Sequence, residues 1–188
     1  FYNTDSLAGW NKGQVLLIMA FYYVVQNIAD VFFKDNFEEF GETIRRGDLD
    51  FRVVKPAPLR LLSFFWQIRF DHTAGIGITA ALFYYALKNL NFSVSAADLG
   101  IGFLFSGISV VLYFSILSFI GSLTFWVEKN ETFNALIFNI SQLSRYPRQI
   151  YRQILGKILT FGIPVALIAT IPAEVALHIE NGWLPLFF

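Results

Sequence analysis

The sequence contains no cysteine, and charged residues make up only 15% of its 188 positions. Without cysteine, the chain cannot form disulfides, thiolate metal sites or a cysteine nucleophile. Basic and acidic residues balance at 14 each, so the composition gives no reason to expect nucleic acid as a partner. Hydrophobic residues account for 55% of the chain, and 22 residues are phenylalanine. A soluble domain of this size would carry more charge, so the composition favours a membrane protein.

Four long apolar runs predict membrane-spanning helices. Crossing a hydrocarbon layer of roughly 30 Å takes about 20 apolar helical residues. The runs cover residues 14–33, 74–90, 98–126 and 158–177. Their hydrophobicity is continuous and does not alternate, which favours helices over barrel strands. The sequence therefore predicts an all-α, polytopic membrane protein with a single transmembrane domain over residues 1–188.

The basic residues predict the orientation of these spans. Twelve of the 14 Lys and Arg residues lie between Lys34 and Arg69 or between Lys129 and Lys157. Basic residues next to a span are retained on the cytosolic side during insertion, so we expect the connections 34–73 and 127–157 to be cytosolic. Four spans with both connections inside would put both ends of this chain outside. We therefore expect a fragment, with one further span at each end and six spans in the full chain.

The first cytosolic connection contains the pattern of a short amphipathic helix. Phe37, Phe40 and Ile44 recur at helical spacing among charged residues, and Gly47 stands where a left-handed cap would end the helix. A turn-prone run with two prolines follows, and a helix is expected to begin again at about Leu59. No other part of the chain is an evident partner for the apolar stripe. The stripe would either dock into a groove on a soluble partner or lie along the membrane interface.

The second cytosolic connection predicts a helix over residues 131–143, a break at Tyr146-Pro147 and a further helix into the last apolar run. Its basic side chains form a rim of Arg145, Arg148, Arg152 and Lys157. This rim would anchor the connection to anionic headgroups. Contact with a partner protein or with the acidic residues of the first connection is the alternative.

Signals of catalysis or ion coupling are weak. The two histidines, His72 and His178, lie at the ends of different runs without neighbouring ligand residues. Gly156-Lys157 is followed by Ile158, so no nucleotide-binding G-x-x-x-x-G-K-[ST] motif occurs. Carboxylates within the apolar runs lie near the run ends, where interfacial anchors are more common than proton relays. We predict no catalytic, cofactor-binding or metal site on this chain, and an energy source on another chain.

Two strings of residues are distinctive: one lies in the first connection, and the other begins in the second connection and continues into the last apolar run. The first is Gly47-Asp48-Leu49-Asp50-Phe51, closed by Lys55-Pro56. The second begins with Ser144-Arg145-Tyr146-Pro147 and continues through Ile150-Tyr151 to Leu159-Thr160-Phe161-Gly162-Ile163-Pro164. In this order and spacing, they resemble the cytosolic signature of the ABC-2 family permeases, the six-span membrane subunits of ABC exporters. The resemblance extends from Gly9-Trp10 to Pro172.

The resemblance implies an exporter-type transmembrane domain in the cytoplasmic (inner) membrane, surrounded by membrane lipid. It implies two cytosolic ABC ATPase subunits and a second permease, identical or homologous, as partners, with ATP and Mg²⁺ on the ATPase and no cofactor on this chain. It assigns coupling to the ATPase to Phe37, Glu38, Phe40, Gly41, Glu42, Ile44, Arg45, Gly47, Asp48, Leu49, Asp50, Lys55 and Pro56. It also assigns a positional role in the gate to Arg145, Tyr146, Pro147 and Tyr151.

One alternative function remains open from the sequence. A membrane scaffold or channel subunit could use the same amphipathic helix to recruit some other cytosolic protein. Only a dependence of function on an ATPase would separate the two interpretations.

Overall fold

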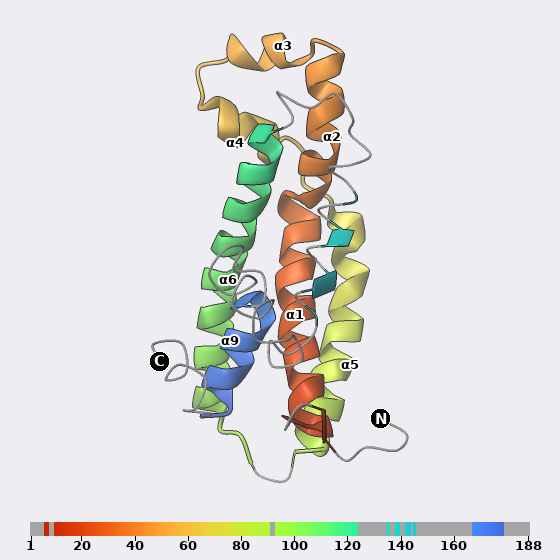
Figure 1. Cartoon of the computed structure of the whole chain (residues 1–188), viewed down its shortest axis with the longest axis vertical. Helices are drawn as coiled ribbons and strands as arrows, with labels where there is room; N and C mark the ends of the chain where they lie inside the picture. The colour runs from red at the N-terminus through yellow and green to blue at the C-terminus, as the bar shows by residue number, and fades with distance from the viewer. Residues whose placement is uncertain are drawn as a thin grey trace.

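Helix α1 (Lys12–Phe32) forms the centre of the computed structural model, as Figure 1 shows. The structure describes residues 6–7, 10–90, 93–123, 135, 138–139, 142–143, 145 and 167–178. Three helices pack around α1: α5 (Gly75–Lys88), α6 (Ala96–Leu123) and α9 (Leu167–Ala176). The protein is therefore a helical bundle, as the sequence predicts.

A small pair of strands precedes α1. β1 (Ser6–Leu7) runs antiparallel to β2 (Trp10–Asn11), with Ser6 opposite Asn11 and Leu7 opposite Trp10. The backbone N–H of Asn11 donates to the side chain of Gln14 at 2.8 Å, which satisfies an N–H group at the helix start. In the described part of the chain, this ladder is the one departure from the all-α prediction.

The other elements of the described residues form the connection between α1 and α5. They are α2 (Lys34–Arg45), α3 (Leu49–Val53), α4 (Leu59–Phe64) and the 3₁₀ helix η1 (Phe70–Ala74). Figure 1 shows α2, α3 and α4 at one end of the bundle and the link between α5 and α6 at the opposite end. The helix expected at about Leu59 is confirmed as α4, and the predicted amphipathic helix is confirmed as α2.

Helices α1 and α6 have the length and composition to cross a membrane, and they are the two such helices among the described residues. α1 falls within two residues of the predicted run 14–33, whereas α6 begins two residues before the run 98–126, whose last three residues lie outside the described ranges. α5, at 14 residues, is shorter than the run 74–90. Only the last part of the run 158–177 is described, as α9, which continues through Pro172. That these four segments span the membrane stays a prediction.

The outer faces of α5 and α6 are apolar and exposed. α6 is apolar on all sides, a pattern that belongs either to a fully buried helix or to one surrounded by lipid. Its exposed large side chains are Ile101, Phe103, Leu104, Ile108, Val111, Phe119 and Leu123, and those of α5 are Ile76, Ile78, Tyr84, Tyr85 and Leu87. Because these side chains are not buried in the chain itself, lipid is the surrounding that suits them.

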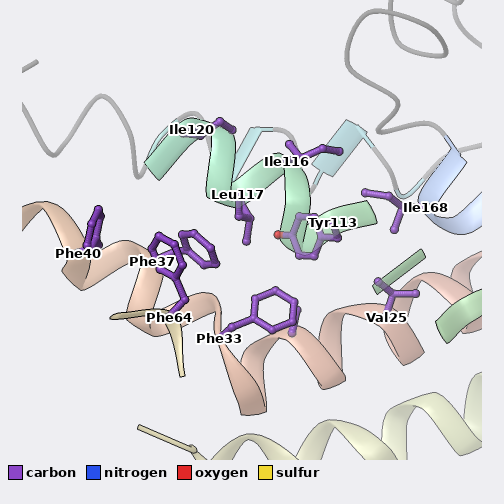
Figure 2. Close-up of a cluster of buried hydrophobic side chains, with 11 residues drawn as sticks. Val25, Phe33, Phe37, Phe40, Phe64, Tyr113, Ile116, Leu117, Ile120 and Ile168 are labelled. Atoms are coloured by element: carbon purple, nitrogen blue, oxygen red, sulfur yellow. The ribbon is translucent and has the colours of Figure 1, made fainter. Parts of the chain in front are cut away.

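Two apolar clusters hold the bundle together. One joins α1 to α5 and α9, and the other joins the α1–α2 junction to α4 and α6 (Figure 2). Gly102 of α6 permits close packing against α1, because a Cβ atom there would lie 2.5 Å from Cζ of Phe21. The second cluster extends beyond the predicted end of the first span at residue 33, so the connection is built onto the bundle.

Candidate functional site

The α2–α4 connection is the part of the structure where the predicted coupling residues gather. α2 continues from α1 across Phe33, α3 crosses the end of the bundle, and α4 returns toward it (Figure 1). The chain reverses at Gly47, whose φ of 75° is the left-handed conformation that glycine adopts at little cost. Gly47 N–H donates to Ile44 O, and Asp48 N–H donates to Thr43 O, both at 3.1 Å. This is a Schellman motif, and it confirms the predicted cap.

The apolar stripe of α2 is buried within the chain, so the expectation that it lacks a partner here is wrong. Phe37 and Phe40 are 3% and 4% exposed. The ring of Phe37 stacks on Phe64 of α4, with centroids 3.8 Å apart and an interplanar angle of 17°. Figure 2 shows Leu117 of α6 directed toward these rings, and Ile120 of α6 belongs to the same cluster. The stripe therefore closes a core between α2, α4 and α6 and is not free to dock elsewhere.

Gly121 of α6 makes this close packing possible. A Cβ atom at Gly121 would lie 3.3 Å from Cδ1 of Phe37, which is tighter than an ordinary van der Waals contact, and 3.4 Å from Cζ of Phe64. Ile44 is partly buried and packs against the same cluster. Phe64 and Gly121 are far from α2 in sequence, which explains why periodicity alone could not identify them.

Polar contacts fix the returning chain beside α2. Asn36 Nδ2 donates to the backbone oxygen of Gln67 at 2.9 Å, and Gln67 N–H donates to Asn36 Oδ1 at 3.1 Å. His72 Nε2 lies 3.1 Å from Asp35 Oδ2, and Arg69 Nη1 lies 3.7 Å from the same carboxylate. These contacts hold α2, the segment after α4 and the start of η1 together.

The end of α2 carries a surface network of charge. Glu42 accepts hydrogen bonds from Arg45 and Arg46, and these bonds lower the pKa of its carboxyl group below the ordinary value. Glu38 differs, because partial burial raises its pKa. Glu42 is thus held ionised at the end of α2, next to the turn that leads into α3.

Helix α3 differs from α2 because none of its residues is buried. Phe51 is 72% exposed and Val54 is 82% exposed, with Val53 also exposed between them. We call Phe51, Val53 and Val54 the apolar tip. The charged residues around it carry both signs: Asp48, Asp50, Arg52 and Lys55.

The apolar tip is anchored to the rest of the connection through Trp66. The guanidinium of Arg52 lies 4.9 Å from the Trp66 ring centroid, and Lys55 Nζ lies 4.2 Å from it. Arg52 Nη1 also donates to the backbone oxygen of Ser63 at 3.3 Å. Cation–π contacts of this kind contribute about 0.5–1 kcal/mol at exposed sites. The tip is therefore exposed but attached at its base.

The thirteen predicted coupling residues fall into three groups by exposure. The buried ones are Phe37, Phe40 and Gly41. The partly buried ones are Glu38, Glu42, Ile44 and Leu49. The exposed ones are Arg45, Gly47, Asp48, Asp50, Lys55 and Pro56. The predicted set of coupling residues does not include Phe51, Val53 or Val54. Three large apolar residues within a charged turn are nevertheless a signal that the sequence offers.

The second predicted motif is described only at Arg145, because Tyr146, Pro147 and Tyr151 lie outside the described residues, as does most of the predicted helix 131–143. The guanidinium of Arg145 lies 5.7 Å from the ring centroid of Tyr23 in α1. This contact joins the second connection to the helix at the centre of the bundle.

Two pockets flank α1. An apolar one of about 470 Å³ lies between α1, η1, α5 and α6, where Asn27 Nδ2 donates to Thr79 Oγ1 at 2.7 Å. A polar one of about 220 Å³ is lined by α1, the first residue of α2, the start of α5, Gln142 and Arg145. Within the described ranges, no group of three or more His, Asp or Glu side chains could hold a metal ion.

The long apolar helices with lipid-suited faces indicate an α-helical membrane protein. A family model described as ABC-2 family transporter protein matches residues 1–186, and the chain belongs to this family. A permease-type transport role follows from that membership. Permeases of this family are generally non-catalytic membrane subunits that pair with ATPase subunits. Searches of the curated proteins and of the solved structures found no match.

Proposed function

We propose that this chain is the multi-pass membrane subunit of an ABC exporter in the cytoplasmic membrane, and that the apolar tip is its contact with the ATPase. Two ATPase subunits would supply the energy, with ATP and Mg²⁺ bound on them, and a second permease would complete the pathway. The observation that carries the proposal is the exposure of Phe51, Val53 and Val54 on the connection between α1 and α5, which we expect to be cytosolic. Membership of the ABC-2 transporter family supports it.

The surroundings of the apolar tip favour a protein partner over the membrane surface. A helix that lies on lipid is usually strongly basic on its polar face. Around the tip, Asp48 and Asp50 offset Arg52 and Lys55. Exposed apolar side chains within a polar rim are typical of protein interfaces, so a partner with a small apolar groove and mixed charge fits this surface.

The packing beneath the tip supports transmission of movement. Arg52 and Lys55 join the tip to Trp66, and Phe64 stacks on Phe37 of α2. Phe37 in turn lies against α6, and α2 continues directly from α1. A displacement of the tip on nucleotide binding would therefore act on α1 and α6 together, which is how we propose that the pathway opens.

The proposal is tested by exchanging the apolar tip for charge. The full-length protein would be purified from its native cells with Phe51→Asp and Val54→Asp combined, and bound proteins would be identified by mass spectrometry. We expect loss of a co-purifying Walker-A ATPase and of ATP hydrolysis in proteoliposomes. Leu61→Asp is the matched control, because Leu61 is exposed on α4 but lies outside the tip, and it should retain both.

Two results would overturn the proposal. One is an ATPase that remains bound and active with the tip variant. The other is a wild-type protein that carries a cytosolic partner but no ATPase, which would support a scaffold or channel subunit.

A further inference from the structure

The polar pocket beside α1 contains hydrogen-bond donors without an acceptor among the described residues. Gln26 is 5% exposed, and its Nε2 has no hydrogen-bond partner in that part of the chain. Arg145 Nε is also buried without a partner there. Both side chains line the same pocket. A buried donor without an acceptor costs about 1–3 kcal/mol of stability for each group. A ligand with acceptor oxygens would accept hydrogen bonds from these donors and remove that cost.

The charge of the pocket favours an anion. Its ionisable lining residues, apart from the two tyrosines, are Asp30, Lys34 and Arg145. Lys34 Nζ lies 2.8 Å from Asp30 Oδ1, so these two charges offset each other. Arg145 forms no ion pair with another residue of the described part, so the lining of the pocket has one uncompensated positive charge. The hydroxyl groups of Tyr22 and Tyr23, which also line the pocket, can act as further donors.

The location of the pocket indicates the source of that anion. Gln26 and Asp30 are one and two helical turns beyond Tyr22 on α1, and Lys34 begins the connection that the charge pattern places in the cytosol. A polar stripe on an otherwise apolar helix marks a functional surface. This end of α1 would lie at the depth of the headgroups of the cytosolic leaflet. Basic pockets between helices at that depth bind acidic lipid headgroups.

From these observations, we infer that the pocket binds the phosphate group of an anionic membrane lipid. Gln26 and Arg145 would donate to the phosphate oxygens. At about 220 Å³, the pocket admits a headgroup phosphate but not a whole lipid, so the acyl chains would lie outside it. The bound lipid would bridge α1 and the second connection. The inference depends on the orientation of α1 and not on coupling to an ATPase, so either proposal can fail without the other.

The test compares Gln26→Leu and Arg145→Gln with the wild-type full-length protein in lipid-free detergent, with phosphatidylglycerol as the probe. Binding would be measured by native mass spectrometry and by the rise in Tm on addition of lipid. We expect each variant to bind the lipid at least roughly tenfold more weakly, since each loses a hydrogen bond to a charged group. Arg46→Gln is the matched control, because Arg46 is an exposed basic residue outside the pocket, and it should bind like the wild type.

A second readout separates a ligand site from a structural role. Gln26→Leu removes an unsatisfied buried donor, so the lipid-free variant should have a Tm equal to or above that of the wild type. Equal lipid affinity in all four proteins, or an equal loss in Arg46→Gln, would overturn the inference. Inorganic phosphate that binds as tightly as the lipid, with the same loss in both pocket variants, would overturn the assignment to a lipid.

Discussion

Helices α2 and α3 are neighbours in the same connection, and both mix phenylalanine with acidic and basic residues. α2 buries its apolar stripe against α4 and α6, whereas α3 has no buried residue. The helix with the clear amphipathic period is thus part of the core, and the short turn without a readable period presents the free surface. Periodicity indicates that a face will be buried, but it does not indicate which chain will bury it.

This difference changes the form of the coupling hypothesis. A contact through Phe37 and Phe40 would require α2 to leave Phe64 and α6. A contact through Phe51 and Val54 requires no unfolding. The surface available to a partner is therefore the exposed end of the connection, and α2 is the element that connects this end to the bundle.

The largest expected effect comes from replacing one phenylalanine of α2 and one phenylalanine of α3 by alanine. Phe37→Ala should lower the free energy of unfolding by about 3–5 kcal/mol, because it removes a buried ring and leaves a cavity between α2, α4 and α6. Phe51→Ala should change it by less than about 0.5 kcal/mol, since Phe51 is 72% exposed. Thermal and denaturant unfolding in detergent would measure both. Equal losses would show that α3 is packed as α2 is.

The hydrogen bonds that attach α2 to the returning chain provide the next test. Asn36→Ala leaves Gln67 N–H and C=O without their partner, so we expect a loss of about 2 kcal/mol. Gln67→Ala is the control, because Asn36 bonds the backbone of Gln67 and not its side chain. A loss of stability in Gln67→Ala equal to that in Asn36→Ala would argue against this backbone contact.

The boundary between the two helices depends on Gly47. Gly47→Ala should cost about 1–2 kcal/mol, because the left-handed conformation is strained for a residue with a Cβ atom. No atom lies within 4 Å of the added Cβ, so the loss would come from the backbone alone. Gly107→Ala, also in open space but within α6, should be neutral or stabilising. Unfolding measurements on the pair would be compared, and an unaffected Gly47→Ala would be inconsistent with the observed cap.

The smallest effect concerns the charge network at the end of α2. The pKa of Glu42 is lowered in the folded protein by Arg45 and Arg46, so its contribution is present above the pKa of the unfolded chain. It is lost as the pH falls through the folded pKa. The Tm of the wild type should thus fall toward that of Glu42→Gln on acidification, and high salt should reduce the difference at neutral pH. A difference in Tm between the two proteins that increases as the pH falls would contradict this prediction.

Local features of the fold could be predicted from the sequence. Apolar length indicated α1 and α6, and Gly47 marked the end of α2, because each signal lies within a few neighbouring residues. The stripe of α2 was predicted correctly as a face, but its partner Phe64 lies beyond a proline-rich turn and Gly121 lies in another helix. Such pairings depend on the tertiary fold and carry no local signal.

The candidate sites show the same limit. The sequence marks the string that contains Phe51, but the exposure of Phe51 follows from how α2 and α4 pack beneath it. The polar pocket required Arg145 to lie beside Gln26, and these residues are far apart in sequence. The fold brings Arg145 next to α1, and no local pattern in the sequence indicates this pairing.

The most direct test of the proposed contact places a single cysteine either in the apolar tip or in α2. Because these 188 residues contain no cysteine, Val54→Cys and Thr43→Cys would each add one defined probe to them, one on the exposed tip and one buried in α2. Maleimide labelling and thiol cross-linking would be compared before and after assembly with the proposed ATPase. The account predicts that Val54→Cys reacts fast alone, becomes protected on assembly and cross-links to the ATPase, while Thr43→Cys stays slow throughout. Cross-linking from Thr43→Cys with Val54→Cys unprotected would contradict it.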